Sequence, residues 1–196
     1  MSKNYIKCTD EELIVMVQNK DRRAFDELMN RYECKILNFI NGFMNNRVVS
    51  EDLTQDTLLK IWINADKYQP IAKFSTWAYT IARNCALTEY RKLKRRNTHS
   101  FSQLSKEDYE FNLDNVQGQE NKDLSSDKET YRFIKSAIAD LPDEFREIII
   151  LKDIQEHSYD EISIITNLAL GTVKSRINRG RRKLKEIIEQ YRRNDN

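Results

Sequence analysis

The sequence predicts an all-α protein made of two small helical domains, an N-terminal helical bundle and a C-terminal helix-turn-helix domain, joined by a flexible acidic linker. The 196 residues include only four glycines and two prolines, too few for the turns of a sandwich, a barrel or a many-stranded sheet. Apolar residues recur at helical spacing through most of the chain. Basic and acidic residues are unevenly distributed along the chain. Residues 1–96 carry 17 basic and 12 acidic side chains, residues 97–127 carry 2 basic and 7 acidic ones, and residues 128–196 carry 14 basic and 12 acidic ones.

The first domain is expected over residues 8–96, with four helices and short connections that are enough to bury one small core. Acidic residues in the first turn favour the first helix, because negative charge is stabilised at a helix N-terminus. Gly42 and the pair Asn45-Asn46 are expected to end the second helix, and Ser50 to cap the third. The predicted bounds are Asp10–Asn19, Arg22–Phe43, Ser50–Ala65 and Ser75–Arg96.

Residues 97–127 are interpreted as the linker, since they show no sustained hydrophobic period and are rich in Ser, Asn, Gln and Asp. A partly ordered loop is the alternative. In that case the scattered apolar residues would dock in a bound state, namely Phe101, Leu104, Tyr109 and Phe111.

The second domain is expected over residues 128–192, where helical spacing returns. One helix covers about 129–139, and another follows Pro142, a residue that suits the first turn of a helix. The run Ile148–Leu151 has strand propensity, but Pro142 and the acidic residues after it favour a helix.

The end of the chain predicts a helix-turn-helix motif. Ser158 and Glu161 fit a capping box, in which each side chain satisfies the other residue's free backbone N–H. The short helix that they start should end at Asn167, which tolerates the left-handed conformation of a tight turn. A longer helix then runs from Gly171 to about Tyr191.

This longer helix carries seven basic residues and no acidic one between positions 174 and 185. Its apolar residues form a stripe toward the core: Val173, Ile177, Leu184 and Ile188. Side chains near its N-terminal end and off the stripe would reach base edges, and the other cations would contact phosphates. A solvated charged face is the alternative, although an all-basic run repels itself and lacks ion pairs along the helix. The expected DNA contacts are Thr172, Lys174, Ser175, Arg176, Arg179, Arg181, Arg182 and Lys183.

A second basic cluster, residues 91–96, contains five basic side chains at the end of a helix that begins with aromatic residues. Cations stabilise a helix C-terminus in any case, so a structural role is one interpretation. Aromatic side chains beside a basic helix can also stack on unpaired bases. Taken singly, Phe74 and Trp77 are more often core residues than nucleic-acid ligands.

Sequence motifs of catalysis are missing. Neither His99 nor His157 has a cysteine or second histidine at ligand spacing, and no Gly-rich phosphate loop, GxSxG or HExxH occurs. We therefore expect no enzyme activity, no metal and no cofactor. The sequence has no 18-residue apolar run, no secretory signal and only three widely spaced cysteines, so we expect a cytoplasmic protein without membrane insertion.

Three stretches occur in an order that is specific to one family. Residues 50–62 read SEDLTQDTLLKIW, residues 74–84 read FSTWAYTIARN, and YDEI at 159–162 is followed by GTVKSR at 171–176. Together they resemble the small alternative sigma factors of bacterial RNA polymerase, of the extracytoplasmic-function type. The first stretch resembles the segment that grips the clamp helices of the largest subunit, the second the segment that reads the −10 element, and the third the region that reads the −35 element.

The resemblance implies a sigma factor that binds core RNA polymerase and directs promoter-specific transcription initiation by recognising −35 and −10 elements and helping to melt the promoter. The implied partners are the clamp helices, the flap of the second-largest subunit, promoter DNA and, as the family's usual regulator, an anti-sigma factor. The basic helix described above would read the −35 element. The implied polymerase contacts are Asp52, Gln55, Asp56 and Lys60. The implied −10 contacts are Lys73, Phe74, Ser75, Trp77, Arg83, Asn84, Arg91, Arg95 and Arg96.

Two further expectations follow from the same resemblance. The loop Tyr68–Phe74 would form the pocket for a base flipped out of the non-template strand. Gly180 stands where the family usually has Ala, which lowers the helix propensity of the basic helix by about 1 kcal/mol.

Two rival functions remain open from the residues themselves. A stand-alone helix-turn-helix regulator would explain residues 158–185 but leave the two N-terminal stretches without a role. A sigma-like decoy that binds polymerase or an inhibitor would explain those stretches but not the intact basic clusters. DNA binding that requires core enzyme separates the first rival from a sigma factor, and transcription output separates the second.

Overall fold

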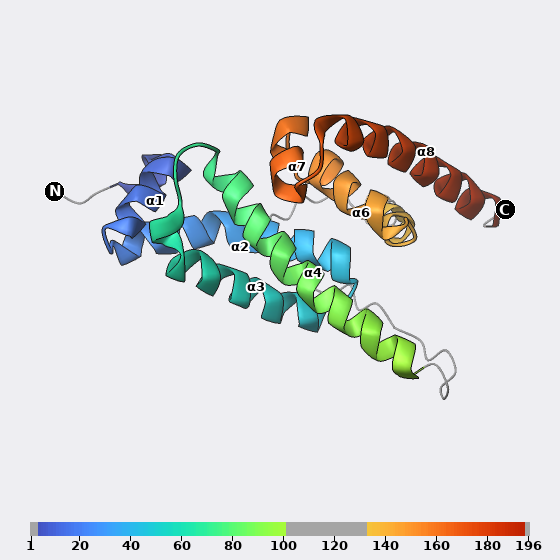
Figure 1. The fold of residues 1–196 in the computed structure, drawn as a ribbon, viewed down its shortest axis with the longest axis horizontal. Coiled ribbons are helices and arrows are strands. Elements are labelled where there is room, and N and C mark those ends of the chain that lie inside the picture. The colour runs from blue at the N-terminus through green and yellow to red at the C-terminus, as the bar shows by residue number, and fades with distance from the viewer. Residues whose placement is uncertain (1–3, 101–132, 195–196) are drawn as a thin grey trace, which may run out of the picture.

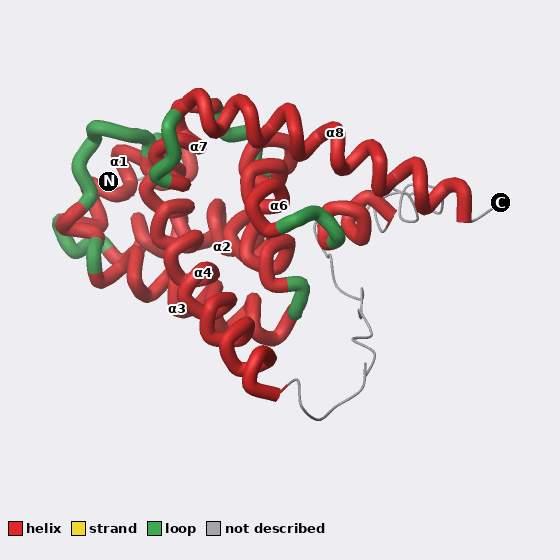
Figure 2. Tube along the Cα trace, turned by 45° about the vertical axis from the view of Figure 1, so that its right-hand side comes forward, coloured by secondary structure: helices red, strands yellow, loops and turns green. Residues whose placement is uncertain are grey.

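The computed structural model describes residues 4–100 and 133–194, and all regular structure within these two ranges is helical (Figures 1 and 2). The predicted all-α fold is therefore confirmed. The N-terminal elements are η1 Tyr5–Lys7, α1 Asp10–Gln18, α2 Arg22–Met44, α3 Arg47–Ile63, η2 Ala65–Lys67 and α4 Phe74–Ser100. The C-terminal elements are a helix over residues 133–139, α6 Asp143–Ile149, the π-helical turn η3 Ile150–Ile154, α7 Tyr159–Thr166 and α8 Leu170–Asn194.

The N-terminal bundle forms because helices α1 to α4 each turn one apolar face inward. Its largest fully buried side chains include Leu13, Leu28, Phe39, Ile61 and Phe74, which come from all four helices. The first turn of α1 is acidic as predicted, and the helix also carries a capping box. The same hydrophobic cluster continues into the C-terminal helices, where α8 packs against α6 and α7.

The start of α3 differs from the prediction. The helix begins at Arg47, because the Asn46 side chain accepts the N–H of Val49 at 3.1 Å and so acts as the N-cap. Ser50 lies inside the helix, is fully buried, and donates its hydroxyl to the Asn46 carbonyl at 2.6 Å. Both residues are good caps, and only the position of the preceding helix end decides between them.

The end of α2 also corrects one expectation. Asn45, with φ 50°, is the left-handed residue that terminates the helix, as predicted for the Asn45-Asn46 pair. Gly42 instead lies within α2, where it allows the side chain of Ile150 to approach closely from the C-terminal half.

Helix α4 is longer than predicted and continues to Ser100, four residues into the stretch interpreted as linker. The remainder of the predicted linker, residues 101–127, lies outside the described residues. The run Ile148–Leu151 is helical as expected, and all four side chains are buried. It bridges the end of α6 and the π-helical turn.

The helix-turn-helix motif has the local structure that its sequence predicts. Ser158 and Glu161 form the capping box at the start of α7. Asn167, with φ 55°, ends α7 in the left-handed conformation, and α8 begins three residues later.

Gly180 lies where α8 packs closely against α6, which gives a physical reason for glycine there. A Cβ added at Gly180 would lie 3.0 Å from Cγ1 of Ile149 and 3.3 Å from Cβ of Phe145. We expect Gly180→Val to lower the free energy of unfolding by about 1–3 kcal/mol, because overpacking outweighs the gain in helix propensity. Urea unfolding followed by circular dichroism measures this difference.

The matched control is Gly171→Val in the first turn of the same helix, where an added Cβ meets nothing within 4 Å. This variant should unfold close to the wild-type midpoint. Equal destabilisation by the two substitutions would contradict a steric role for Gly180.

Candidate nucleic-acid interface

Helix α8 separates an apolar side from a basic side as the sequence predicts. Val173 and Ile177 are fully buried against the other helices of the domain, and Leu184 packs against the core at its edge. Among the predicted contacts, Thr172, Ser175 and Arg176 are half-buried at the N-terminal end. The exposed ones are Lys174, Arg179, Arg181, Arg182 and Lys183.

Two arginines of α8 are oriented by carboxylates from the same domain. Nη2 of Arg176 lies 3.4 Å from Oε2 of Glu144, and Nε of Arg181 donates to Asp153 at 3.1 Å. Arg181 remains about half exposed, and ion pairs at such positions contribute little to stability. A phosphate oxygen can therefore replace either carboxylate at small cost, and the pairs fix side-chain direction more than they hold the fold.

Helix α4 presents its predicted contacts on two different faces. Asn84, Arg91 and Arg95 are exposed and recur at spacings of seven and four residues, so they form one stripe that faces away from the bundle. Arg83 belongs to a second stripe about a quarter of a turn away, where it pairs with Glu147 of α6. Arg96, at the end of the cluster, is exposed.

The aromatic residues at the start of α4 serve the core. The Phe74 ring is fully buried and makes an edge-to-face contact with Tyr32, at 5.1 Å between ring centroids. Trp77 is half-buried and packs against Tyr68 and Phe74 at 5.6 and 6.0 Å. Ser75 is also half-buried, and the Lys73 side chain is exposed.

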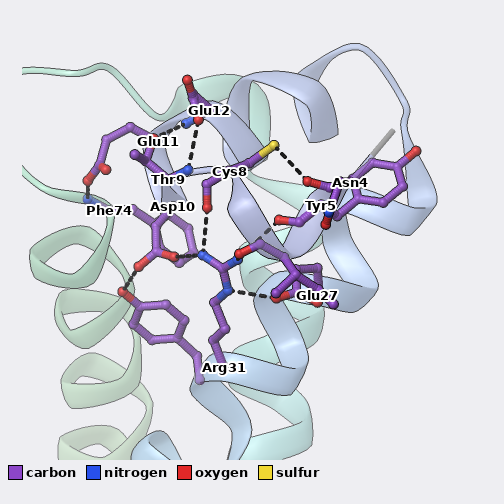
Figure 3. A network of polar contacts seen from close by, with 12 residues as sticks. Asn4, Tyr5, Cys8, Thr9, Asp10, Glu11, Glu12, Glu27, Arg31 and Phe74 are labelled. Carbon is purple, nitrogen blue, oxygen red and sulfur yellow. Dashed lines mark hydrogen bonds and ion pairs between the residues drawn. The ribbon is translucent and has the colours of Figure 1, made fainter. Parts of the chain in front are cut away.

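The loop before α4 is held in place by α1, a contribution that the sequence analysis missed. The amide side chain of Gln18 donates to the carbonyls of Ala65 and Tyr68 at 3.0 and 2.9 Å. A carboxylate oxygen of Glu11 accepts the backbone N–H of Phe74 at 2.9 Å (Figure 3). Neither residue belongs to a recognisable motif, because each acts through a contact 47 to 63 residues away in sequence.

The N-terminal segment itself is tied to α2 by one arginine. Arg31 donates to the backbone carbonyls of Tyr5, Ile6 and Cys8 and pairs with Asp10 at 2.8 Å (Figure 3). These contacts position α1, and α1 in turn positions the loop that precedes α4.

Helix α3 carries a mixed exposed face. The predicted polymerase contacts Asp52, Gln55 and Asp56 are all exposed. Lys60 is exposed as well, with its ammonium 3.2 Å from the Cys85 sulfur on α4. Leu59 and Ile63 share the face of Asp52 and Asp56, and their exposed fractions are 56% and 64%. These two residues were missed, although apolar residues out of register with the buried set are a signal that the sequence contains.

Glu161 of α7 has an unusual acidity. Burial favours its neutral form, but hydrogen bonds from Lys73 and from the backbone and side chain of Ser158 outweigh burial and lower the pKa of Glu161 from 4.5 to about 2. A carboxyl group whose pKa is lower in the folded state stabilises the protein at any pH above its unfolded-state pKa. This contribution disappears as the pH falls through the folded-state pKa.

We therefore expect Glu161→Gln to destabilise the protein at neutral pH and to have less effect as the pH falls from 4.5 toward about 2. Gln at this position still accepts a capping hydrogen bond, so the substitution mainly removes charge. Urea unfolding of both proteins across this pH range measures the difference. A difference that stays constant with pH would contradict an ionised Glu161 as its source.

Within residues 4–100 and 133–194, no helix combines the length and the apolarity that a bilayer span requires. The same ranges hold no group of three or more histidine, cysteine or acidic side chains arranged to bind a metal ion.

Comparison with protein families gives two matches, in the same order as the two helical halves. The family model for Sigma-70 region 2 matches residues 28–96, which cover α3 and most of α2 and α4. The family model for Sigma-70 region 4 matches residues 134–184, which include α6, α7 and most of α8.

Full-length relatives agree with this assignment. The chain is 33% identical over 189 residues to the ECF RNA polymerase sigma factor SigW of Bacillus subtilis, covering 89% of this chain and 94% of the relative. It is 30% identical over 185 residues to the ECF RNA polymerase sigma-E factor of Haemophilus influenzae, covering 92% and 96%. Among solved structures, the sigma factor RpoE of Bartonella quintana, in complex with the anti-sigma factor NepR, has a TM-score of 0.68 and 27% identity, over 84% of this chain and 96% of that one.

Proposed function

Since the chain belongs to the extracytoplasmic-function group of the sigma-70 family and is a factor for promoter-directed transcription initiation, we propose that it reads the −35 and −10 elements and helps to melt the promoter. The single observation that carries this proposal is α8, whose apolar side is buried while its basic side faces solvent at the end of a helix-turn-helix. The chain acts as a DNA-targeting subunit, and the polymerase supplies the chemistry.

The −35 element is read by α8 in the major groove. The half-buried N-terminal side chains Thr172, Ser175 and Arg176, together with Arg179, reach base edges. The exposed cations that follow contact phosphates and provide affinity without sequence preference: Lys174, Arg181, Arg182 and Lys183.

The −10 element is read by α4 and the loop that precedes it. The stripe of Asn84, Arg91 and Arg95 lies on one exposed side of α4, with Arg96 beyond it, and suits a single DNA strand. The loop Tyr68–Phe74, braced by α1, receives a flipped base, since unstacking costs a few kcal/mol that pocket contacts can recover. Phe74 acts through the core, where its ring supports Trp77.

Core polymerase binds the exposed face of α3 through Asp52, Gln55, Asp56 and Lys60. The apolar pair Leu59 and Ile63 supplies the centre of this contact, because buried apolar anchors carry most of the free energy of an interface. The flap of the second-largest subunit contacts the C-terminal domain. An anti-sigma factor is a further expected partner, since RpoE of Bartonella quintana was crystallised with one.

The test is transcription in vitro with core RNA polymerase on fragmented genomic DNA, with and without this protein, followed by sequencing of transcript 5′ ends. We expect new, discrete start sites that share −10 and −35 motifs. Arg176→Ala should weaken initiation at these sites by roughly 5–150-fold and relax the preference at one −35 position, as the loss of one base contact does.

Other outcomes assign a different function. Binding to core polymerase without any new start site would indicate a decoy. Binding to duplex DNA without any binding to core polymerase would indicate a stand-alone regulator, and the sigma role would then be wrong for this chain.

A further inference from the structure

His157 lies between η3 and α7, at the place where the C-terminal helices meet α4. Helix α7 packs against α4 (Figures 1 and 2). The ring of His157 meets the ring of Tyr79 on α4 edge to face, with centroids 4.6 Å apart. Only 5% of His157 and 2% of Tyr79 is exposed, and the Tyr79 hydroxyl donates to Gln155. The imidazole is therefore a buried part of the contact between the two halves.

The backbone that precedes His157 has two uncommon features. In the π-helical turn η3, the N–H of Gln155 donates to the carbonyl of Ile150 at 3.0 Å. Glu156 follows with φ 60°, a left-handed conformation that is unfavourable for a residue other than glycine. The N–H of His157 then donates to the Leu151 carbonyl at 3.0 Å, which fixes the position of the histidine. Both features cost free energy, and both are frequent at functional and switching positions.

The two ring nitrogens of His157 have different surroundings. Nδ1 lies 3.6 Å from a carboxylate oxygen of Glu161, so the single proton of the neutral ring belongs on Nδ1. Nε2 is buried, and no group within residues 4–100 and 133–194 forms a hydrogen bond with it. A second proton on the ring would make Nε2 a charged N–H donor without an acceptor. Such a group is costly inside a protein, whereas water satisfies it when α4 moves away.

The charged groups that face the ring do not compensate for its burial. They are Glu161 on α7, Lys73 just before α4 and Lys152 on η3. Glu161 is shared with Lys73 at 2.9 Å, and Lys152 donates to the His157 carbonyl at 3.1 Å. Burial raises the pKa of Tyr79, so its hydroxyl stays neutral. Burial also lowers the pKa of His157 below its ordinary value of 6.5; it outweighs the opposing effect of Glu161, and both lysines add to the lowering.

We propose that His157 is a pH-sensitive latch: its neutral ring packs on Tyr79 and holds the C-terminal helices against α4, and protonation of Nε2 releases them. The latch goes beyond the promoter-reading role and does not depend on it. When α4 moves away, water reaches Nε2 and the ring regains an ordinary affinity for protons. The separated state therefore binds more protons than the joined state, so the latch holds fully above about pH 6.5 and weakens as the pH falls below that value.

Small-angle X-ray scattering of the full chain in three buffers, at about pH 7.5, 6.5 and 5.5, measures separation of the two halves. We expect the radius of gyration to increase as the pH falls. The ratio of separated to joined molecules should rise by up to about tenfold across this range, because only the separated state binds the second proton. Ordinary carboxyl groups titrate at about pH 4, below this range, and do not contribute.

Two substitutions remove titration from position 157. His157→Phe keeps an aromatic ring for the contact with Tyr79, and His157→Gln keeps a polar side chain that is neutral at every pH. Both variants should scatter alike in all three buffers. The matched control is His99→Gln, which removes the other histidine of the sequence and should respond to pH as the wild type does.

Proton NMR of the imidazole signals gives an independent measurement. The sequence contains two histidines, so the same variants assign both signals. We expect the signal of His157 to titrate below pH 6.5, and the signal to be absent from both His157 variants.

The proposal is overturned if the wild type scatters identically in all three buffers, or if the folded His157→Phe and His157→Gln proteins expand in acid as the wild type does. A His157 signal that titrates at or above pH 6.5 overturns it as well. Circular dichroism in each buffer establishes that a variant is folded, and either His157 variant alone suffices if the other is not. These measurements use neither DNA nor polymerase, so their failure leaves the promoter-reading role to the transcription test.

Discussion

Replacing Phe74 with alanine should lower the free energy of unfolding by about 3–5 kcal/mol, which is enough to unfold much of a marginally stable domain. The ring is fully buried where α1, α2 and α4 meet, and it contacts the rings of Tyr32, Tyr68 and Trp77. Alanine leaves a cavity that the neighbouring aromatic rings cannot fill. Thermal and urea unfolding measure the loss.

The matched control for Phe74 is Asn84→Ala, an exposed site on the same helix. Surface substitutions of this kind usually change stability by less than about 0.5 kcal/mol. This control should weaken binding of single-stranded DNA while the protein stays folded. Phe74→Ala should lower stability instead, and at a low temperature at which it is still folded it should bind single-stranded DNA as the wild type does. If Phe74→Ala kept full stability and lost DNA binding, Phe74 would be a nucleic-acid ligand and its burial in the core would be irrelevant to its role.

Replacing Leu59 with aspartate should weaken binding to core polymerase by roughly 30-fold or more, the loss expected at the centre of an interface. Leu59 is 56% exposed on α3, next to Ile63 and on the same face as Asp52 and Asp56. A carboxylate added on this face would lose its hydration when polymerase binds, which raises the free energy of the complex. In the free protein the carboxylate stays hydrated, so stability should not change. Fluorescence anisotropy with labelled protein and core enzyme measures the affinity.

The matched control for Leu59 is Val15→Asp, an apolar residue of α1 that is 48% exposed and outside α3. Both variants should unfold near the wild-type midpoint, and only the α3 variant should lose affinity. Equal losses would show a general effect of added charge. Wild-type affinity in the Leu59→Asp protein would remove α3 from the polymerase contact.

Local patterns in the sequence were enough to predict the helices. The capping box of Ser158 and Glu161 and the left-handed Asn167 involve residues at most five positions apart, so nothing distant can overrule them easily. The apolar stripe of α8 is equally local, because side chains three and four positions apart share a face. For the same reason the basic side of α8 could be identified before any fold was known.

Where the local sequence allows two alternative roles for a residue, tertiary contacts decide between them. Asn46 and Ser50 are both good helix caps, and the end of α2 at Asn45 leaves Asn46 in the capping position and buries Ser50 beside Asn41. Phe74 fits both a stacking platform and a core, and its contact with Tyr32 of α2 places it in the core. Leu59 and Ile63 have large apolar side chains of the kind found in cores, yet no helix of the described bundle covers them.

Local sequence patterns predict the helical class, the order of the helices, the helix-turn-helix and the sign of charge on its outer face, because each depends on neighbours within about two turns. Which cations of α4 face solvent and which meet carboxylates depends instead on tertiary packing. Arg83 and Glu147 are 64 residues apart, and Gly42 meets Ile150 across a still longer separation. Contacts at such separations depend on how whole helices pack, and packing depends on the shapes of both surfaces together. The hydrophobic period of one segment therefore does not predict them.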